Sequence, residues 1–212
     1  MISPDELRER LAGPVVAMTT HFKDDYSLDL DAMRVLTEYY IEQKVPTVIV
    51  TGSTGEFFEL SDEERKQVQK VVVETASGSD MTVICGASHS GSHLTLELAK
   101  YAEGLGAHGV MITPPYYGTN GGGFPVIMNH YDFVTSRIDI GVVIYFSGAV
   151  LWQVQAPIAD PQLMIDLVDA CNGRAAGFKD PSGNFHSAGT RTWGVRMTTT
   201  NSPPSNSLST TT

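Results

Sequence analysis

The sequence is poor in cysteine, in positive charge and in long apolar runs. Two cysteines, Cys85 and Cys171, are too few for a disulfide framework, and neither lies in a Cys-x-x-Cys spacing, which indicates a reducing compartment. With 14 Lys and Arg against 24 Asp and Glu, the net charge of −10 argues against a nucleic-acid or anionic-membrane partner. No apolar run approaches a membrane span, and the charged residues 1–10 lack the apolar core of a signal peptide. We therefore expect a cytoplasmic protein.

What is present is a regular alternation of short apolar runs and amphipathic stretches. The 212 residues, 42% hydrophobic and 18% charged, suffice for one ordinary globular domain. The apolar runs are rich in β-branched residues and start 26 to 35 residues apart, which is typical of parallel α/β architecture. These runs start near Pro14, Pro46, Met81, Ala107, Gly141 and Ala175.

The stretches between these runs predict helices. Ser61 and Glu64 have the spacing of a capping box and open a helix to about residue 74. Other helices are predicted over 31–43 and 92–105, and one begins at Asp160-Pro161. In the first of them one apolar face is expected to hold Met33, Leu36, Tyr39 and Tyr40.

Residues that could bind a substrate or take part in a reaction follow several different strands, as expected at the carboxyl-end face of a barrel. They are Thr51–Glu56, Pro114–Tyr117, Tyr145 and Lys179. No GxGxxG or GxxxxGK[ST] motif follows the first strand, so a nucleotide-binding sheet is disfavoured. The predicted fold is α/β of the (β/α)8 TIM-barrel type, incomplete, with about six βα units.

The periodic pattern ends near Ala188. Residues 197–212 are a Ser/Thr/Asn/Pro tract with too few apolar residues to pack. We expect a partial barrel over residues 1–188 and a non-homologous, disordered tail over 189–212. Six units leave the two edge strands of the sheet unpaired, which predicts that the sheet is unstable or prone to aggregate.

Lys179 ends the last apolar run and is followed at once by a Pro/Ser/Gly turn. An amine held in apolar surroundings has a lowered pKa and can attack a carbonyl to form a Schiff base. The alternative is a solvated turn residue. The other lysines lie in a polar loop or on helices, at Lys23, Lys44, Lys66, Lys70 and Lys100.

Three stretches carry a family resemblance: GSTGEFFELSDEER at 52–65, TPPYYG at 113–118 and GFKDPSGN at 177–184. From about Val15 to Asn184 the sequence resembles the pyruvate-dependent class I aldolases of the dihydrodipicolinate synthase and N-acetylneuraminate lyase superfamily. The resemblance implies a carbon–carbon or carbon–oxygen lyase for pyruvate or another 2-oxo acid. It implies no metal or cofactor, and a homo-oligomer, either a dimer or a homotetramer.

The resemblance also assigns roles to residues. Lys179 would form the imine, Tyr145 would transfer protons, and Ser53 would take the relay hydroxyl position. Thr54 and neighbouring backbone N–H groups, including that of Gly55, would hold the substrate carboxylate together with Ser53. Tyr117 would be the relay tyrosine that is lent to a neighbouring subunit.

Other interpretations stay open. The turn at 52–55 could be a plain strand-to-helix connection, Tyr117 a surface or interface residue, and Tyr145 a core residue. His89 and His93 have a spacing that would suit a metal-dependent aldolase.

The residues after Tyr145 bear on the reaction. They are Phe146-Ser147-Gly148-Ala149, without the arginine that family members in lysine biosynthesis place nearby, which favours an aldolase or dehydratase for a 2-oxo sugar acid or for another 2-oxo acid. The alternatives are 4-hydroxy-tetrahydrodipicolinate synthase and an inactive, truncated remnant.

Overall fold

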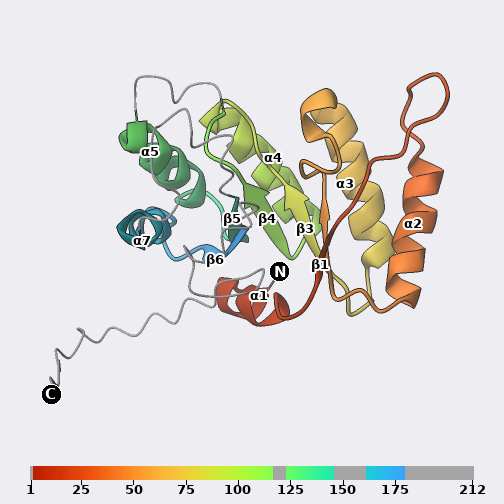
Figure 1. Cartoon of the computed structure of the whole chain (residues 1–212), viewed down its shortest axis with the longest axis horizontal. Coiled ribbons are helices and arrows are strands. Elements are labelled where there is room, and N and C mark those ends of the chain that lie inside the picture. The colour runs from red at the N-terminus through yellow and green to blue at the C-terminus, as the bar shows by residue number, and fades with distance from the viewer. Residues whose placement is uncertain (1, 117–122, 146–160, 180–212) are drawn as a thin grey trace, which may run out of the picture.

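The computed structural model describes residues 2–116, 123–145 and 161–179. Within them, six parallel strands form one sheet whose spatial order is the order of the chain (Figure 1). Each strand is buried on both faces except β1, which is half-buried, and this explains the continuous apolar runs of the sequence. The strands are β1 (Val15–Ala17), β2 (Thr47–Val50), β3 (Thr82–Gly86), β4 (Gly109–Ile112), β5 (Gly141–Tyr145) and β6 (Ala175–Lys179).

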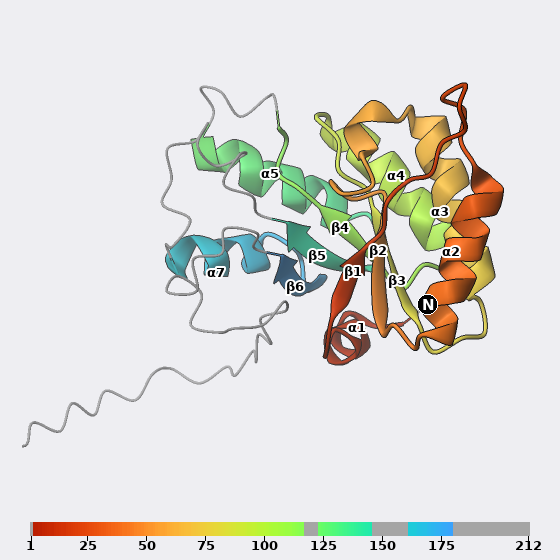
Figure 2. The same cartoon turned by 45° about the vertical axis from the view of Figure 1, so that its right-hand side comes forward.

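Helices α2, α3, α4, α5 and α7 cover the outside of the curled sheet, and each lies between one strand and the next along the chain (Figure 2). Helix α2 packs on α3, α3 on α4, α4 on α5, and α5 on α7. The α/β half-barrel predicted from the sequence is therefore confirmed. The helices are α1 (Pro4–Arg10), α2 (Leu30–Glu42), α3 (Asp62–Ala76), α4 (Ser92–Leu105), α5 (Gly123–Thr135) and α7 (Pro161–Asp169), with a 3-10 turn η1 (Phe57–Glu59).

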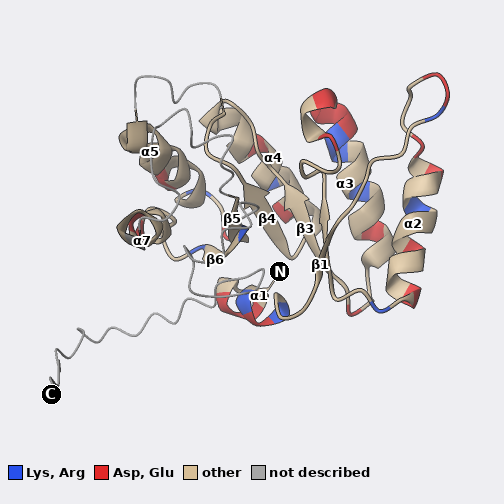
Figure 3. Cartoon of the chain, viewed as in Figure 1, with Lys and Arg blue, Asp and Glu red and all other residues tan. Residues whose placement is uncertain are grey.

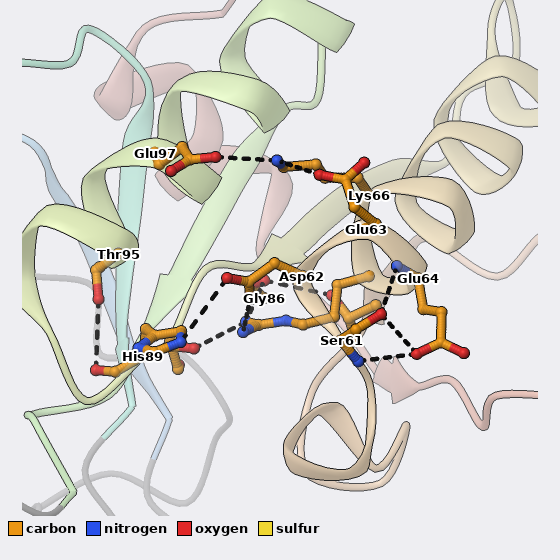
Figure 4. Close-up of polar contacts among 12 residues, drawn as sticks. Ser61, Asp62, Glu63, Glu64, Lys66, Gly86, His89, Thr95 and Glu97 are labelled. Carbon is orange, nitrogen blue, oxygen red and sulfur yellow. Dashed lines mark hydrogen bonds and ion pairs between the residues drawn. The ribbon is translucent and has the colours of Figure 1, made fainter.

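The predicted capping box opens α3. The Ser61 hydroxyl accepts from the Glu64 amide at 3.3 Å, and the Ser61 amide donates to the Glu64 carboxylate at 2.9 Å (Figure 4). These bonds satisfy amide groups that the first helical turn would otherwise leave unpaired. The pKa of Glu64 is lowered, because its carboxylate accepts a hydrogen bond from the Ser61 hydroxyl at 2.7 Å as well as the one from the Ser61 amide.

One expectation for α2 is wrong. Tyr39 was expected on the apolar face, but its side chain is 53% exposed. The buried residues of this helix are Met33 and Thr37, one turn apart, and the Thr37 hydroxyl donates to the Met33 carbonyl. That internal bond lowers the cost of burying the Thr37 hydroxyl. Tyr39 lies about 200° further round the helix than Thr37 and therefore faces solvent.

Two apolar layers lie on the two faces of the sheet. The larger one, between sheet and helices, includes Val48 and Val50, whereas Ile49 between them faces the interior of the half-barrel. This alternation is the two-residue period of a strand. The interior cluster consists of Leu7, Leu11, Ile49, Ile84, Met111, Val143, Tyr145 and Ala176.

Helix α1 closes the end of the interior where the strands begin, a feature that the sequence analysis missed. Its Leu7 is fully buried against Gly109 and Gly141, where a Cβ would come within 2.6 and 2.7 Å of the leucine side chain. Arg8 donates to the Ala175 carbonyl of β6 at 3.0 Å. Helix α1 thus covers the amino ends of the strands, and a substrate could enter the interior at their carboxyl ends.

Charged residues gather on the helices and loops rather than on the strands (Figure 3). No helix among residues 2–116, 123–145 and 161–179 is long and apolar enough to cross a membrane. Both cysteines are free and buried. In the described residues β1 and β6 are the two edge strands. The tail predicted for 189–212 lies outside the described residues.

Candidate active site

Lys179 and Tyr145 lie side by side at the carboxyl ends of the last two strands. They are register partners in the β5–β6 pair, so their side chains share one face of the sheet. The lysine Nζ lies 4.3 Å from the centroid of the tyrosine ring. Both residues are buried, with 5% and 8% exposure. The interpretation of Lys179 as a solvated turn residue is therefore wrong.

An irregularity in β6 sets the face on which Lys179 lies. Val142 pairs with Ala175, but Val143 pairs with Gly177, so Ala176 is an extra residue in the strand. Because the side-chain period is two, one extra residue reverses the face of everything after it. Without the insertion Lys179 would lie on the helix-covered face; with it, the amine shares the interior with Tyr145.

The surroundings of the amine change its acidity. Burial lowers the pKa of Lys179, because the charged ammonium form loses solvation. The interior cluster on this face, which includes Val143, Ala176 and Met111, is apolar. More of the amine is therefore neutral, and nucleophilic, at a given pH than in an exposed lysine.

The turn after β2 lies at the same end of the interior. A Cβ at Gly52 would come within 3.2 Å of the side chains of Ile49 and Met111, both members of the interior cluster. Along the turn Ser53 is half-buried, Thr54 is exposed and Gly55 is buried. The structure thus brings this turn to the barrel end that also holds Lys179.

The turn offers hydrogen-bond donors. Within the described part of the chain, the amide and hydroxyl groups of Ser53 and Thr54 have no hydrogen-bond partner. The Thr20 hydroxyl fixes the turn from outside by donating to the Gly55 carbonyl at 2.7 Å. Backbone N–H groups and hydroxyls gathered in one turn can receive a carboxylate.

Tyr117 lies outside the described residues, as do residues 146–149 after β5. The neighbouring Tyr116 is described, and its ring lies 6.1 Å from that of Phe57 in an edge-on arrangement. The relay role of Tyr117 and its place at a subunit interface stay predictions.

The metal alternative gains no support from the geometry. His89 lies 3.8 Å from Asp62 (Figure 4), and its Nδ1 accepts from the Gly91 amide. Burial lowers the pKa of His89, although Asp62 opposes this. In the described residues no group of three or more His, Cys, Asp or Glu side chains could hold a metal ion.

The sequence analysis missed a buried polar network behind the turn. Gln69 and Arg65 of α3 are 0% and 2% exposed, and both donate to the Gly86 carbonyl at the end of β3. Arg65 also donates to the Ser88 carbonyl at 2.8 Å and stacks 5.1 Å from the Phe57 ring centroid. The available signal was the spacing of both residues in the apolar stripe of α3.

The fold and this site define an α/β-barrel protein with a buried lysine at a strand end. The chain belongs to the dihydrodipicolinate synthetase family, which matches residues 10–190. It is 37% identical over 135 residues to 4-hydroxy-tetrahydrodipicolinate synthase of Chlorobium chlorochromatii, covering 64% of this chain and 45% of that protein.

Two solved structures superpose on most of the chain. Dihydrodipicolinate synthase of Aquifex aeolicus matches with a TM-score of 0.71 and 27% identity, over 83% of this chain and 57% of that one. N-acetylneuraminate lyase of Mycoplasma synoviae matches with a TM-score of 0.73 and 26% identity, over 84% and 58%. The chain thus spans about half the length of the curated relatives it matches.

Proposed function

We propose that this chain is a Schiff-base-forming lyase that acts on pyruvate or a related 2-oxo acid through Lys179. The observation that carries the proposal is the buried amine at the end of β6, 4.3 Å from the Tyr145 ring centroid. Membership of the dihydrodipicolinate synthetase family supports it.

The chemistry needs only groups of the chain. The neutral Lys179 amine adds to the keto carbon, and loss of the keto oxygen as water leaves an imine. When the imine is protonated it withdraws electrons, so the adjacent carbon loses a proton or a bond to it breaks. The Tyr145 hydroxyl moves the proton, while Ser53, Thr54 and the amide of Gly55 hold the carboxylate. Hydrolysis of the imine returns the amine.

Two observations bear on the substrate class. The likeness to 4-hydroxy-tetrahydrodipicolinate synthase favours pyruvate as the first substrate. The absence of arginine from the four residues after Tyr145 favours an aldolase or dehydratase for a 2-oxo sugar acid over the synthase itself. Turnover on a panel of 2-oxo acids, with and without aldehyde, separates the two reactions.

Borohydride reduction in the presence of pyruvate tests the proposal. The reagent converts an imine into a stable amine, so peptide mass spectrometry should find the adduct on Lys179 alone. Lys179→Met should abolish it, whereas Lys44→Met, a change in an exposed lysine, should not. An unmodified Lys179 in a folded sample would instead identify an inactive relative.

The resemblance also supports a homo-oligomer in which Tyr117 reaches a neighbouring subunit's site. Sedimentation velocity should then show a dimer or tetramer. A monomer that still traps pyruvate would remove the proposed role of Tyr117 and leave that of Lys179 intact.

A further inference from the structure

We propose that Gln69 is a positioning residue: it holds Thr51 in a left-handed backbone conformation and thereby keeps the turn at 52–55 over the barrel interior. The proposal rests on the proposed function, because it treats that turn as the carboxylate site. Gln69 belongs to α3 and is not a residue to which the family resemblance gave a role.

Thr51 is the strained element. It directly follows β2, is 1% exposed, and has a φ of +52°. A β-branched residue is a rare occupant of this region, since its side chain crowds the backbone. Such a conformation persists only where surrounding contacts enforce it.

Gln69 supplies the enforcing contacts. Its side-chain amide donates to the Thr51 hydroxyl at 2.7 Å and to the Gly86 carbonyl at 2.8 Å. The Thr51 hydroxyl in turn donates to the same carbonyl at 3.3 Å. A carbonyl oxygen can only accept, so the nitrogen of the Gln69 amide must face Gly86, and its orientation is thereby fixed.

The location of Gln69 argues against a packing role. The residue is fully buried in α3, where the other buried residues of the stripe, such as Val68 and Val72, are apolar except for Arg65. A buried amide is costly there unless its donors are used. Both of its donated bonds go to the ends of β2 and β3 rather than to helix neighbours. An aliphatic side chain would fill the space without making them.

The consequence for the site follows from the chain direction. The β2–β3 pairing ends with Val50 and Cys85, and Thr51 then bends away from the sheet. The bend brings Gly52 against Met111 of the interior cluster, so Ser53 and Thr54 follow at the carboxyl end of the strands, the end that also holds Lys179. If Thr51 relaxed to an extended conformation, the donors of the turn would leave this place.

The first experiment needs no substrate. Gln69→Met keeps the length of the side chain and removes the amide, and Val72→Ala serves as a control that removes core contacts elsewhere on α3. Amide hydrogen exchange, followed by mass spectrometry on peptides that cover residues 51–57, should be about tenfold faster in Gln69→Met and not in Val72→Ala. Equal exchange in the two variants would overturn the inference.

The second experiment uses borohydride trapping at a series of pyruvate concentrations. For Gln69→Met the half-saturating concentration should rise about tenfold, while the adduct formed at saturation is unchanged. Val72→Ala should lower thermal stability without moving the half-saturating concentration. A loss at saturation with an unchanged midpoint would contradict a role through the carboxylate site.

A double variant isolates the role of the strain. Glycine adopts a φ of +52° freely, so in Thr51→Gly the turn no longer needs Gln69. Adding Gln69→Met to Thr51→Gly should therefore change the pyruvate midpoint less than twofold, against about tenfold in the wild-type background. Equal effects in both backgrounds would show a packing role. If the wild-type chain traps no pyruvate, the proposed function fails, and the exchange experiment alone decides the positioning role.

Discussion

The carbonyl oxygen of Thr51 lies over the α-carbon of Gly86, so close that a Cβ at position 86 would be 2.0 Å from it. No side chain can occupy that space without displacing the end of β2. Because Gly86 has no side chain, the Thr51 carbonyl can lie against it where β2 ends, and the turn at 52–55 depends on this close approach.

Replacing this glycine should damage both stability and binding. We expect Gly86→Ala to cost about 1–3 kcal/mol of unfolding free energy, because the backbone oxygen has to move. Its pyruvate midpoint in borohydride trapping should also rise. Urea unfolding measures the change in unfolding free energy, and borohydride trapping at a series of pyruvate concentrations measures the midpoint. The control is Gly104→Ala in α4, where a Cβ meets nothing within 4 Å and the helix should gain up to about 1 kcal/mol.

The Tyr145 hydroxyl can be tested apart from its ring. Tyr145→Phe keeps the ring against the Lys179 amine, so the imine should still form. Proton transfer should slow by at least about 100-fold, because a positioned acid–base group is lost. The readout is exchange of pyruvate methyl protons with deuterium oxide, followed by NMR. Tyr131→Phe, which removes a buried hydroxyl bonded to the Ile112 carbonyl, should leave that exchange unchanged.

The lowered pKa of Lys179 predicts how trapping depends on pH. Its folded-state pKa lies below the ordinary value of about 10.4, so the neutral amine appears at lower pH than in a free lysine side chain. The trapping rate at fixed pyruvate should rise with pH and reach its half-point below about 10.4. A half-point at or above that of acetyl-lysine amide in the same buffer would contradict a desolvated amine.

The free energy of unfolding should also rise with pH because of Lys179. The unfolded chain binds more protons than the folded chain between the two pKa values, so stability rises with pH across that window. In Lys179→Met the free energy of unfolding, measured in urea at a series of pH values, should rise less across this window, since methionine does not titrate.

His130 predicts acid sensitivity. It is 1% exposed, and burial lowers its pKa from 6.5 to about 4. Between pH 6.5 and 4 this histidine is protonated in the unfolded chain but not in the folded one. The free energy of unfolding should therefore fall by about 3 kcal/mol as the pH drops across that range. His130→Asn, which can retain a bond to Ser92, should remove most of this slope. His93→Gln, at an exposed position, should leave it as it was.

Local patterns in the sequence determined the order of elements. The capping box at Ser61, the continuous apolar runs and the strand-end position of Lys179 are short-range features, and the structure has each of them where the sequence placed it. They depend on hydrogen bonds and side-chain alternation within a few residues, so one sequence suffices to find them.

Contacts between distant segments decided the rest. The extra residue Ala176, which turns Lys179 inward, is visible only in the register of β6 against β5. Leu7 under the strands and Gln69 behind the turn act across gaps in the sequence that no local pattern spans. Which face a lysine takes, and what holds a strained turn, depend on packing partners, and those are fixed only when the sheet has formed.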